Sequence, residues 1–239
     1  MPDLSFVIPV YNEEASLERL YAELTAAAAP LKLSYEVVLT DDASTDRSWS
    51  ILQQLAQRDP RWRAQRFAYN CGESAASAAG MKAAGGDIII TLDADLQNDP
   101  ADLPAFLRAL ENADCVCGSR VHHRADHWVR RLSSRIANAV RNRLSGESIS
   151  DAGCTYRAFR RSMLAEVKFF RGAHRFLPTL FRMEGYRVVE IPITPRERFA
   201  GYSKYSIGNR VFKSFADLLA VRWMKSRRLN YRVAETTRR

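Results

Sequence analysis

The stretch that decides the fold runs from residue 87 to residue 100 and reads Asp87-Ile88-Ile89-Ile90-Thr91-Leu92-Asp93-Ala94-Asp95-Leu96-Gln97-Asn98-Asp99-Pro100. Ile88–Leu92 is short, almost entirely apolar and rich in β-branched residues, and a Gly-Gly pair stands just before residue 87. This pattern predicts a strand that is buried on both faces, and therefore a central strand of a parallel sheet.

Oxygen-bearing side chains begin where the apolar run stops. If the chain stays extended past Leu92, alternate side chains point the same way, and Asp93, Asp95 and Gln97 converge on one side. All-oxygen ligands suit a hard cation such as Mg²⁺ or Mn²⁺, which commonly binds one or two carboxylates and substrate phosphates. We therefore expect a metal site in this crevice, where open α/β sheets bind ligands. The alternative is an acidic loop whose Asp residues only cap the next helix.

Strands alternate with helices through the first half of the chain. We expect strands at Leu4–Val10, Tyr35–Thr40, Trp62–Phe67 and Ile88–Leu92, helices ending near Ala28 and Ala84, and between them a helix capped by Ser44 or Thr45. This order is typical of right-handed βαβ units. It predicts an α/β fold with a mostly parallel central sheet flanked by helices.

Polar residues follow three of these strands. They are Tyr11 and Glu13 after the first, Asp41 and Asp42 after the second, and Asp93 and Asp95 after the fourth. All lie on the carboxyl edge of the sheet and can surround one ligand. The chain has no Gly-x-Gly-x-x-Gly after its first strand and no Gly-x-x-x-x-Gly-Lys-Ser/Thr, which disfavours a Rossmann dinucleotide site and a P-loop. Acidic side chains here suit a base and a ribose, with a metal neutralising a diphosphate.

Composition sets further bounds. The 239 residues are 46% hydrophobic and 26% charged, which suits one globular α/β domain with an appended subdomain. No stretch reaches the roughly 18 uninterrupted apolar residues of a membrane span. The four cysteines show no paired framework, which fits a reducing cytoplasm. We expect Cys115 and Cys117 to be two small core residues of a strand, rather than zinc ligands with His122 and His123.

The formal net charge of +9 indicates a polyanionic partner such as phosphorylated substrates, an anionic membrane surface or nucleic acid. The positive charge lies in the second half. Residues 120–143 hold seven Arg against one acidic residue, and residues 222–239 hold seven Lys or Arg against one.

Several motifs resemble the family 2 glycosyltransferases of the GT-A fold. The segments that carry this resemblance are Ser5–Glu14, Asp41–Asp46 and Asp93–Gln97. Later segments are similar to the polyprenyl-phosphate branch, which includes dolichyl-phosphate mannose synthase and bacterial undecaprenyl-phosphate sugar transferases. These are Gly118-Ser119-Arg120, Arg130-Arg131-x-x-Ser134-x-x-x-Asn138, Asp151-x-Gly153-Cys154-Thr155-Tyr156-Arg157 and Arg198-x-x-Gly201-x-Ser203-Lys204-Tyr205. The match covers roughly residues 4–224. Gly153–Arg157 is closer to the bacterial members, which argues against GDP-mannose as the donor.

The resemblance implies transfer of a sugar from a UDP- or GDP-linked donor to a polyprenyl phosphate, with inversion at the anomeric carbon. It implies that the nucleotide-sugar is held by Pro9, Tyr11, Glu13, Asp41, Asp42, Asp93 and Ala94. It places Mg²⁺ or Mn²⁺ at Asp93, Asp95 and Gln97, and the acceptor phosphate at Arg120, Arg130, Ser134, Arg198 and Lys204. The implied catalytic residues are Asp93, Asp95, Arg120, Arg198 and Lys204.

This chemistry agrees with the residue types. A lipid monophosphate has a second pKa of about 6, so it needs little from a general base, and none of the four histidines lies in a recognisable base position. It does need cations that bring two anions together, and guanidinium groups bind phosphate oxygens in bidentate fashion. Structural alternatives remain: a solvated side chain for Arg130, a flexible basic loop for Arg198 and Lys204, core packing for Tyr11, and a favourable first-turn charge for Glu13.

The last long segment, Val211–Met224, combines apolar and basic residues. It is either a helix packed on the catalytic domain or an in-plane membrane helix, with Phe212, Phe215 and Trp223 among the acyl chains and cations at the headgroups. We expect a catalytic domain at 1–209, with a nucleotide-sugar half (1–118) and an acceptor half (119–209), and an amphipathic helix with a basic tail at 210–239. The expected location is cytoplasmic, peripheral on the cytoplasmic face of an anionic membrane. If the helix only packs on its domain, lipid delivery requires a membrane-embedded partner protein.

Three other functions compete. One is a family 2 transferase that acts on a soluble or saccharide acceptor. A basic nucleic-acid-binding module would have no use for an oxygen-ligand cluster, so we expect no nucleic acid partner. A catalytically silent scaffold is disfavoured by the intact Asp93, Asp95 and Gln97.

Overall fold

The computed structural model describes residues 1–120, 149–151, 153–194, 196–197, 199, 207–229 and 234–235, and for 207–214 the backbone alone. Its strands are β1 (Leu4–Val10), β2 (Tyr35–Asp41), β3 (Trp62–Arg66), β4 (Ile88–Thr91), β5 (Cys115–Ser119), β6 (Arg157–Arg160) and β7 (Val188–Pro192). Its α-helices are α1 (Leu17–Ala28), α2 (Ser48–Arg58), α3 (Glu73–Ala83), α4 (Leu103–Leu110), α6 (Leu177–Met183) and α7 (Ile207–Ser226). Short 3-10 helices are η1 (Ala29–Leu31), η2 (Pro100–Asp102), η4 (Arg161–Glu166) and η5 (Ala173–Arg175).

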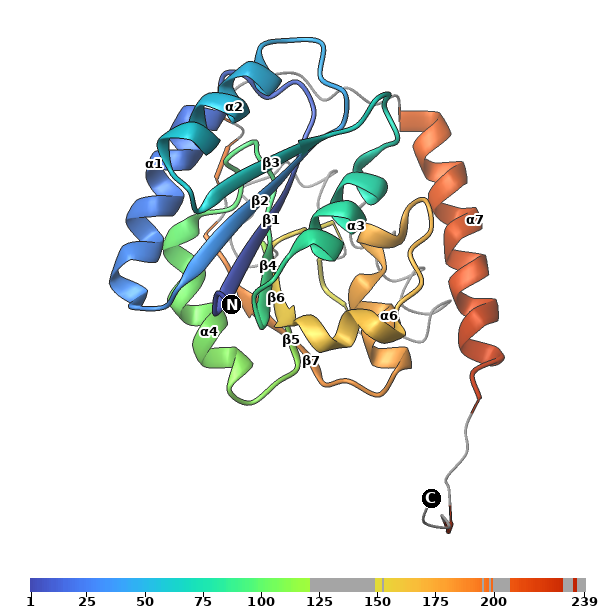
Figure 1. The fold of residues 1–239 in the computed structure, drawn as a ribbon. Helices are drawn as coiled ribbons and strands as arrows, with labels where there is room; N and C mark the ends of the chain where they lie inside the picture. The colour runs from blue at the N-terminus through green and yellow to red at the C-terminus, as the bar shows by residue number, and fades with distance from the viewer. Residues whose placement is uncertain are drawn as a thin grey trace.

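The strands form one sheet in the order β3-β2-β1-β4-β6-β5-β7 (Figure 1). Neighbours pair in parallel except at β6, which runs antiparallel to both β4 and β5. The predicted mostly parallel sheet is confirmed. The strand at the centre of the opening stretch, β4, holds the middle position, and Ile89 and Ile90 are fully buried.

Helices cover both faces of the sheet (Figure 1). On one face α1, α2 and α4 pack on the sheet, and their leucines join Phe6, Ile8 and Ile90 in the largest core cluster. On the other face α3 and α6 pack against a second cluster, which contains Cys115 and Cys117. The two thiols are therefore buried core groups, as predicted.

The expected cap of α2 is wrong. The helix begins at Ser48, and neither Ser44 nor Thr45 caps it. The Ser44 hydroxyl instead accepts a hydrogen bond from the Asn12 N–H at 2.9 Å, across the loop that follows β1. The Asp46 carboxylate accepts from the Ser48 N–H at 2.9 Å. The Ser44 hydroxyl therefore links two loops at the sheet edge. The first N–H of α2 is bound by Asp46 and not by Ser44 or Thr45.

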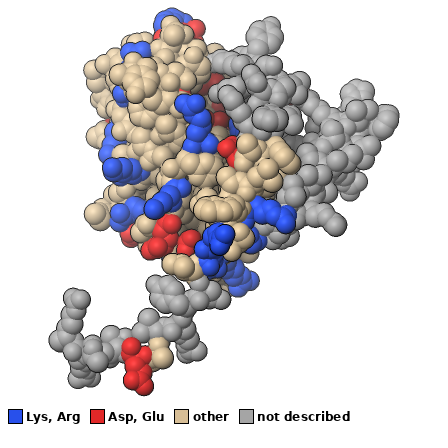
Figure 2. Space-filling model, turned by 90° about the vertical axis from the view of Figure 1, so that its right-hand side faces the viewer, with Lys and Arg blue, Asp and Glu red and all other residues tan. Residues whose placement is uncertain are grey.

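Helix α7 packs on the domain with one face and exposes apolar side chains on another. Leu218 and Val221 are buried in a third cluster, formed with η5 and α6. Phe215, Leu219 and Trp223, spaced four residues apart, are exposed. One face of the helix therefore packs on the domain, and the in-plane membrane interpretation stays a prediction. Exposed cations follow on the same helix and just beyond it: Arg222, Lys225, Arg227 and Arg228. Figure 2 looks at this side of the molecule and shows several Lys and Arg side chains on it, with some Asp and Glu among them.

No helix among the residues with a described position is long and apolar enough to cross a bilayer. The backbone of α7 begins at Ile207, close to the predicted boundary at residue 210, and the division of the chain at residues 118 and 209 stays a prediction.

Candidate active site at the carboxyl edge of the sheet

The loop after β4 turns sooner than we expected. The backbone bends at Ala94 and Asp95, and Leu96 has a φ of +64°, so the predicted extended chain through Gln97 is wrong. Two interactions favour the turn: Asp95 Oδ1 accepts the Gln97 N–H at 3.1 Å, and the Ala94 and Leu96 side chains are buried in the core. Packing in the core thus compensates for a backbone conformation that is unusual for leucine.

Asp93 lies at the end of β4 and is held from the neighbouring strand β6. The Thr155 hydroxyl donates to Asp93 Oδ2 at 2.6 Å, and the Thr91 hydroxyl donates to the Thr155 carbonyl at 2.5 Å. Burial and the nearby charges of Glu73 and Asp95 raise the pKa of Asp93 to about 7, against the opposite effects of Thr155 and Arg120. Without a cation, therefore, this carboxyl gives up its proton only near neutral pH.

Three carboxylates influence one another at this position: Glu73, Asp93 and Asp95. Like charges confined together favour either protonation or a bound cation. In the part of the chain with described coordinates, no group of three or more His, Cys, Asp or Glu is arranged to hold a metal ion alone. The donor set instead fits Mg²⁺ or Mn²⁺, which are usually bound by one or two carboxylates plus substrate phosphates.

Arg120 lies near Asp93 but is already paired. Its Nε and Nη2 bind the two oxygens of Asp151 at 2.7 and 3.0 Å, and its backbone N–H donates to the same carboxylate. Burial alone would lower the pKa of Arg120, but the Asp151 hydrogen bonds and charge outweigh it and raise that pKa. The guanidinium is therefore a fixed cation of the site.

Asp41 and Asp42 hold the site together at the end of β2. Asp41 is fully buried and pairs with Arg66 Nε at 3.0 Å. The Asp42 carboxylate accepts from the Cys71 and Gly72 N–H groups at 2.6 and 2.8 Å, and from the Asn70 side chain at 2.9 Å. Asp42 thereby occupies backbone N–H groups at the start of α3 that an anion such as a phosphate would otherwise use.

The loops after β1 and β2 are joined by further hydrogen bonds. Asn12 has a φ of +54°, and its Oδ1 accepts the Thr45 N–H at 2.8 Å. The Glu13 N–H donates to the Ser48 hydroxyl at 2.8 Å. Pro9, Tyr11 and Glu13 are partly exposed at this edge, so a ligand can reach them from solvent. Their contacts with a nucleotide-sugar stay a prediction.

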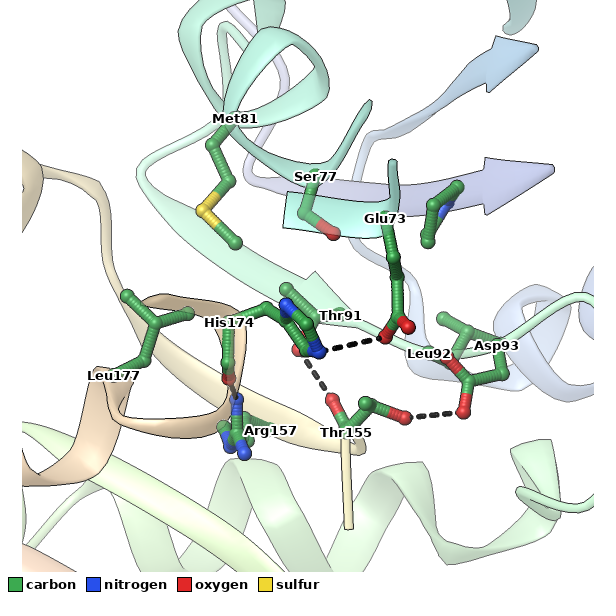
Figure 3. A pocket seen from close by; sticks show the side chains of 11 residues that line it. Glu73, Ser77, Met81, Thr91, Leu92, Asp93, Thr155, Arg157, His174 and Leu177 are labelled. Atoms are coloured by element: carbon green, nitrogen blue, oxygen red, sulfur yellow. Dashed lines mark hydrogen bonds and ion pairs between the residues drawn. The ribbon is translucent and has the colours of Figure 1, made fainter. Parts of the chain in front are cut away.

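A cleft opens between α3, the end of β4, β6 and η5 (Figure 3). Its lining includes six polar residues that are absent from the predicted site: Glu73, Ser77, Thr91, Thr155, Arg157 and His174. Thr155 and Arg157 belong to the Asp151–Arg157 motif, which carries part of the family resemblance. Glu73 follows a glycine at the start of a helix. No sequence pattern marks His174 as a site residue, because it reaches the cleft only through the fold of η5.

Among the predicted site residues, Asp93 and Pro9 line this cleft. Ala94 and Asp95 lie in the turn that follows Asp93. Gln97, the third predicted metal ligand, comes just after that turn and is partly exposed. Four predicted acceptor residues lie outside the described part of the chain: Arg130, Ser134, Arg198 and Lys204.

A family model described as "Glycosyl transferase family 2" matches residues 5–168, which is more than half of the chain. The chain belongs to glycosyl transferase family 2. The matched range includes β1 from its second residue, all of β2 to β6, the three carboxylates and the Asp93–Thr155 contact. The resemblance inferred from the motifs is thus confirmed at the level of the family.

Individual relatives within this family show which of its members the chain is similar to. The chain is 40% identical over 205 residues to an undecaprenyl-phosphate 4-deoxy-4-formamido-L-arabinose transferase from Edwardsiella ictaluri, covering 85% of the chain and 63% of the relative. It is 42% identical over 205 residues to the transferase of the same name from Pseudomonas paraeruginosa, covering 85% of the chain and 60% of the relative. The chain therefore spans about three fifths of the length of these relatives.

Solved structures agree on the fold. A glucosyl-3-phosphoglycerate synthase from Mycobacterium tuberculosis, in complex with phosphoglyceric acid, superposes with a TM-score of 0.69 at 21% identity, over 92% of this chain and 80% of that one. A mannosyltransferase from Pyrobaculum calidifontis, in complex with GDP-Man and Mn²⁺, gives 0.64 at 20% identity, over 96% and 65%. At these identities the likeness is one of fold, and it confirms the GT-A architecture.

Proposed function

We propose that this chain is an inverting, metal-dependent glycosyltransferase that moves a sugar from a UDP- or GDP-linked donor to a polyprenyl phosphate. The observation that carries the proposal is the group of carboxylates around Asp93 and Asp95, at the carboxyl edge beside a cleft. The polyprenyl-phosphate acceptor is supported by the names of relatives that are 40 to 42% identical.

Asp95, Asp93 and Gln97 would hold Mg²⁺ or Mn²⁺, which when bound offsets the negative charge of the leaving nucleoside diphosphate. Other residues of this chain would determine where the diphosphate binds. Asp42 keeps the start of α3 closed to the diphosphate, because it occupies the Cys71 and Gly72 N–H groups. The diphosphate is therefore directed toward the acidic turn and the fixed cation Arg120.

In the proposed reaction an oxygen of the acceptor phosphate attacks the anomeric carbon. A new carbon–oxygen bond forms on one face while the bond to the nucleoside diphosphate breaks on the other, which inverts the configuration. The phosphate is already largely ionised near neutral pH, so no proton needs to move. Arg120, Arg130, Ser134, Arg198 and Lys204 remain the proposed acceptor-phosphate ligands, and the charge of the basic ones lets two anions approach.

We propose that the protein acts at the cytoplasmic face of a membrane without spanning it. Phe215, Leu219 and Trp223 form an exposed apolar row on α7, and the cations at its end would lie near anionic headgroups. A membrane-embedded partner protein is the alternative route for delivering the lipid.

The test combines binding and transfer. Thermal unfolding is followed with UDP, GDP, CDP and dTDP, each with Mn²⁺ or with chelator. A ligand at 100 times its Kd stabilises the folded state by about 2.7 kcal/mol. Labelled sugar transfer is then measured to undecaprenyl phosphate and to 3-phosphoglycerate. We expect Mn²⁺-dependent stabilisation and a labelled lipid. Labelling of the soluble acceptor alone would support the competing transferase, and no response to any nucleotide would refute the proposal.

A further inference from the structure

Glu73 provides a second carboxylate in the cleft, beside Asp93. It is the first residue of α3, and its side chain extends from the helix toward Asp93 and His174 (Figure 3). Its charge is one of the main influences on Asp93. Two carboxylates in one small cleft repel each other, so this arrangement costs free energy unless a ligand uses it.

His174 fixes the position of Glu73. The imidazole is 7% exposed; its Nδ1 lies 2.6 Å from the Ser74 hydroxyl, and its Nε2 lies 3.4 Å from Glu73 Oε1. The backbone around it is anchored as well, since the Gly172 N–H donates to the Ser74 hydroxyl at 2.8 Å. Arg175 Nε donates a hydrogen bond to His174 Nε2 at 3.2 Å, which holds the ring from its own segment. The ring therefore sets the distance between η5 and the carboxylate on α3.

The cleft offers a ligand both an acceptor and a donor. Glu73 supplies carboxylate oxygens at its side. Arg157 lines the same cleft, is 2% exposed, and donates from Nη1 to the His174 carbonyl, while its Nε has no partner among the described atoms. Much of the remaining lining is apolar, with Met81, Leu92 and Leu177. The cleft itself is narrow, so a ligand would meet Glu73 at the open side, where this side chain is 32% exposed.

The chemistry of Glu73 restricts what approaches it. A diphosphate is a poor partner for Glu73 in the absence of a bridging metal, because a carboxylate repels phosphate oxygens, and Asp42 occupies the two N–H groups just before this helix. The partner must donate a hydrogen bond and carry no negative charge. A sugar hydroxyl meets this requirement, as does an amide N–H on a sugar, and a hydroxyl can also accept a bond from a donor such as Arg157 Nε.

We propose that Glu73, oriented by His174, binds a hydroxyl or amide N–H of the donor sugar and thereby selects the sugar that is transferred. This inference rests on the proposed function, because it presumes a nucleotide-sugar donor. It makes Glu73 a specificity-determining residue and His174 a positioning residue. The nucleoside diphosphate itself would not contact either.

The test separates the sugar from the nucleotide. Calorimetry in Mn²⁺ measures Kd for UDP and for UDP-glucose, UDP-galactose, UDP-xylose and UDP-N-acetylglucosamine, or for GDP and GDP-mannose if GDP binds. The sugar increment is the ratio of Kd for the diphosphate to Kd for its best sugar conjugate. In Glu73→Gln we expect this increment to fall about tenfold, since a hydrogen bond to a charged acceptor is replaced by a weaker one to a neutral amide oxygen, while Kd for the diphosphate stays within about twofold.

Two substitutions of His174 test positioning. Asparagine places its amide near Nδ1 and can keep the Ser74 contact, whereas glutamine reaches the position of Nε2 beside Glu73. We expect His174→Asn to lower the sugar increment as Glu73→Gln does. We expect His174→Gln to keep the increment near its wild-type value. Glu111→Gln, on the exposed end of α4, is the matched control and should change neither Kd.

Several results would overturn the inference. An unchanged increment in Glu73→Gln would show that Glu73 does not contact the sugar. An equal loss of diphosphate affinity would assign Glu73 to the nucleotide. A wild type that binds no sugar conjugate better than its diphosphate would also remove the basis for the inference. These results differ from failure of the proposed function, in which the wild type binds no nucleoside diphosphate at all.

Discussion

The ionisation of Asp93 makes the stability of the metal-free protein depend on pH in an unusual direction. Its pKa is about 7 in the folded state, against 3.8 as the ordinary value, so between these pH values the folded protein binds more protons than the unfolded chain. The free energy of unfolding therefore falls as pH rises from about 4 to about 7. Linkage gives a loss of about 2 kcal/mol by pH 5 and about 4 kcal/mol by pH 8.

Asp93→Asn removes this ionisation while keeping the shape of the side chain. We expect the stability of the variant relative to wild type to rise by about 2 to 3 kcal/mol between pH 5 and pH 8, because the variant escapes the loss that the wild type undergoes over this range. Urea unfolding in chelator at both pH values measures it. Asp87→Asn, at the other end of the same stretch and with an 83% exposed side chain, is the matched control.

A relative stability of Asp93→Asn that is the same at pH 5 and pH 8 would refute the reasoning. So would an Asp87→Asn control that changes by as much as Asp93→Asn. A smaller change of the expected sign would mean that solvent in the open cleft screens the three carboxylates more than their burial indicates.

Three further predictions concern other parts of the molecule. Asp95→Asn should lower transfer about 100-fold with little change in unfolding temperature, and equal turnover by wild type and variant would count against the metal site. Gly172→Ala should destabilise the protein more than Gly185→Ala. Both glycines have positive φ, which costs a non-glycine residue about 1–3 kcal/mol, but of the two only Gly172 would bring an added Cβ into collision with a carboxylate on α7. Equal urea midpoints for the two variants would contradict this. Replacing Leu219 and Trp223 by serine should weaken co-sedimentation with anionic vesicles at low salt, and unchanged binding would show that α7 serves only to pack on the domain.

Regular elements of the first half could be predicted because their signals are local. Leu4–Val10 and its neighbours are apolar runs bounded by polar turns, and the structure places β1 at the predicted residues. The acidic residues at the strand ends also lie at one edge, as parallel pairing requires. The turn at Ala94 and Asp95 could not be read in this way. It depends on a leucine adopting positive φ because the core accepts its side chain, and this is a tertiary effect.

The Glu73–His174 pair was missed for a related reason. The two residues are about one hundred positions apart, and no spacing rule connects a helix start to a 3-10 turn. Their contact depends on Gly172, which adopts a φ of +99° just before η5. Sequence patterns identify side chains that share a helix face or a strand edge, whereas this pair is brought together by packing of the second half on the first.

The position of β6 has a consequence for biosynthesis. Strands β1 to β4 leave the ribosome first, yet β4 receives its second neighbour only when residues 157–160 have been made, and β5 waits for the same strand. Until then the nascent chain carries a four-stranded sheet with an apolar, unpaired edge at β4, which is a known site of aggregation. The two halves of the chain therefore cannot mature independently: the sheet grows beyond β4 only after a four-residue strand has been inserted, and the interval before that step is when a chaperone would be needed most.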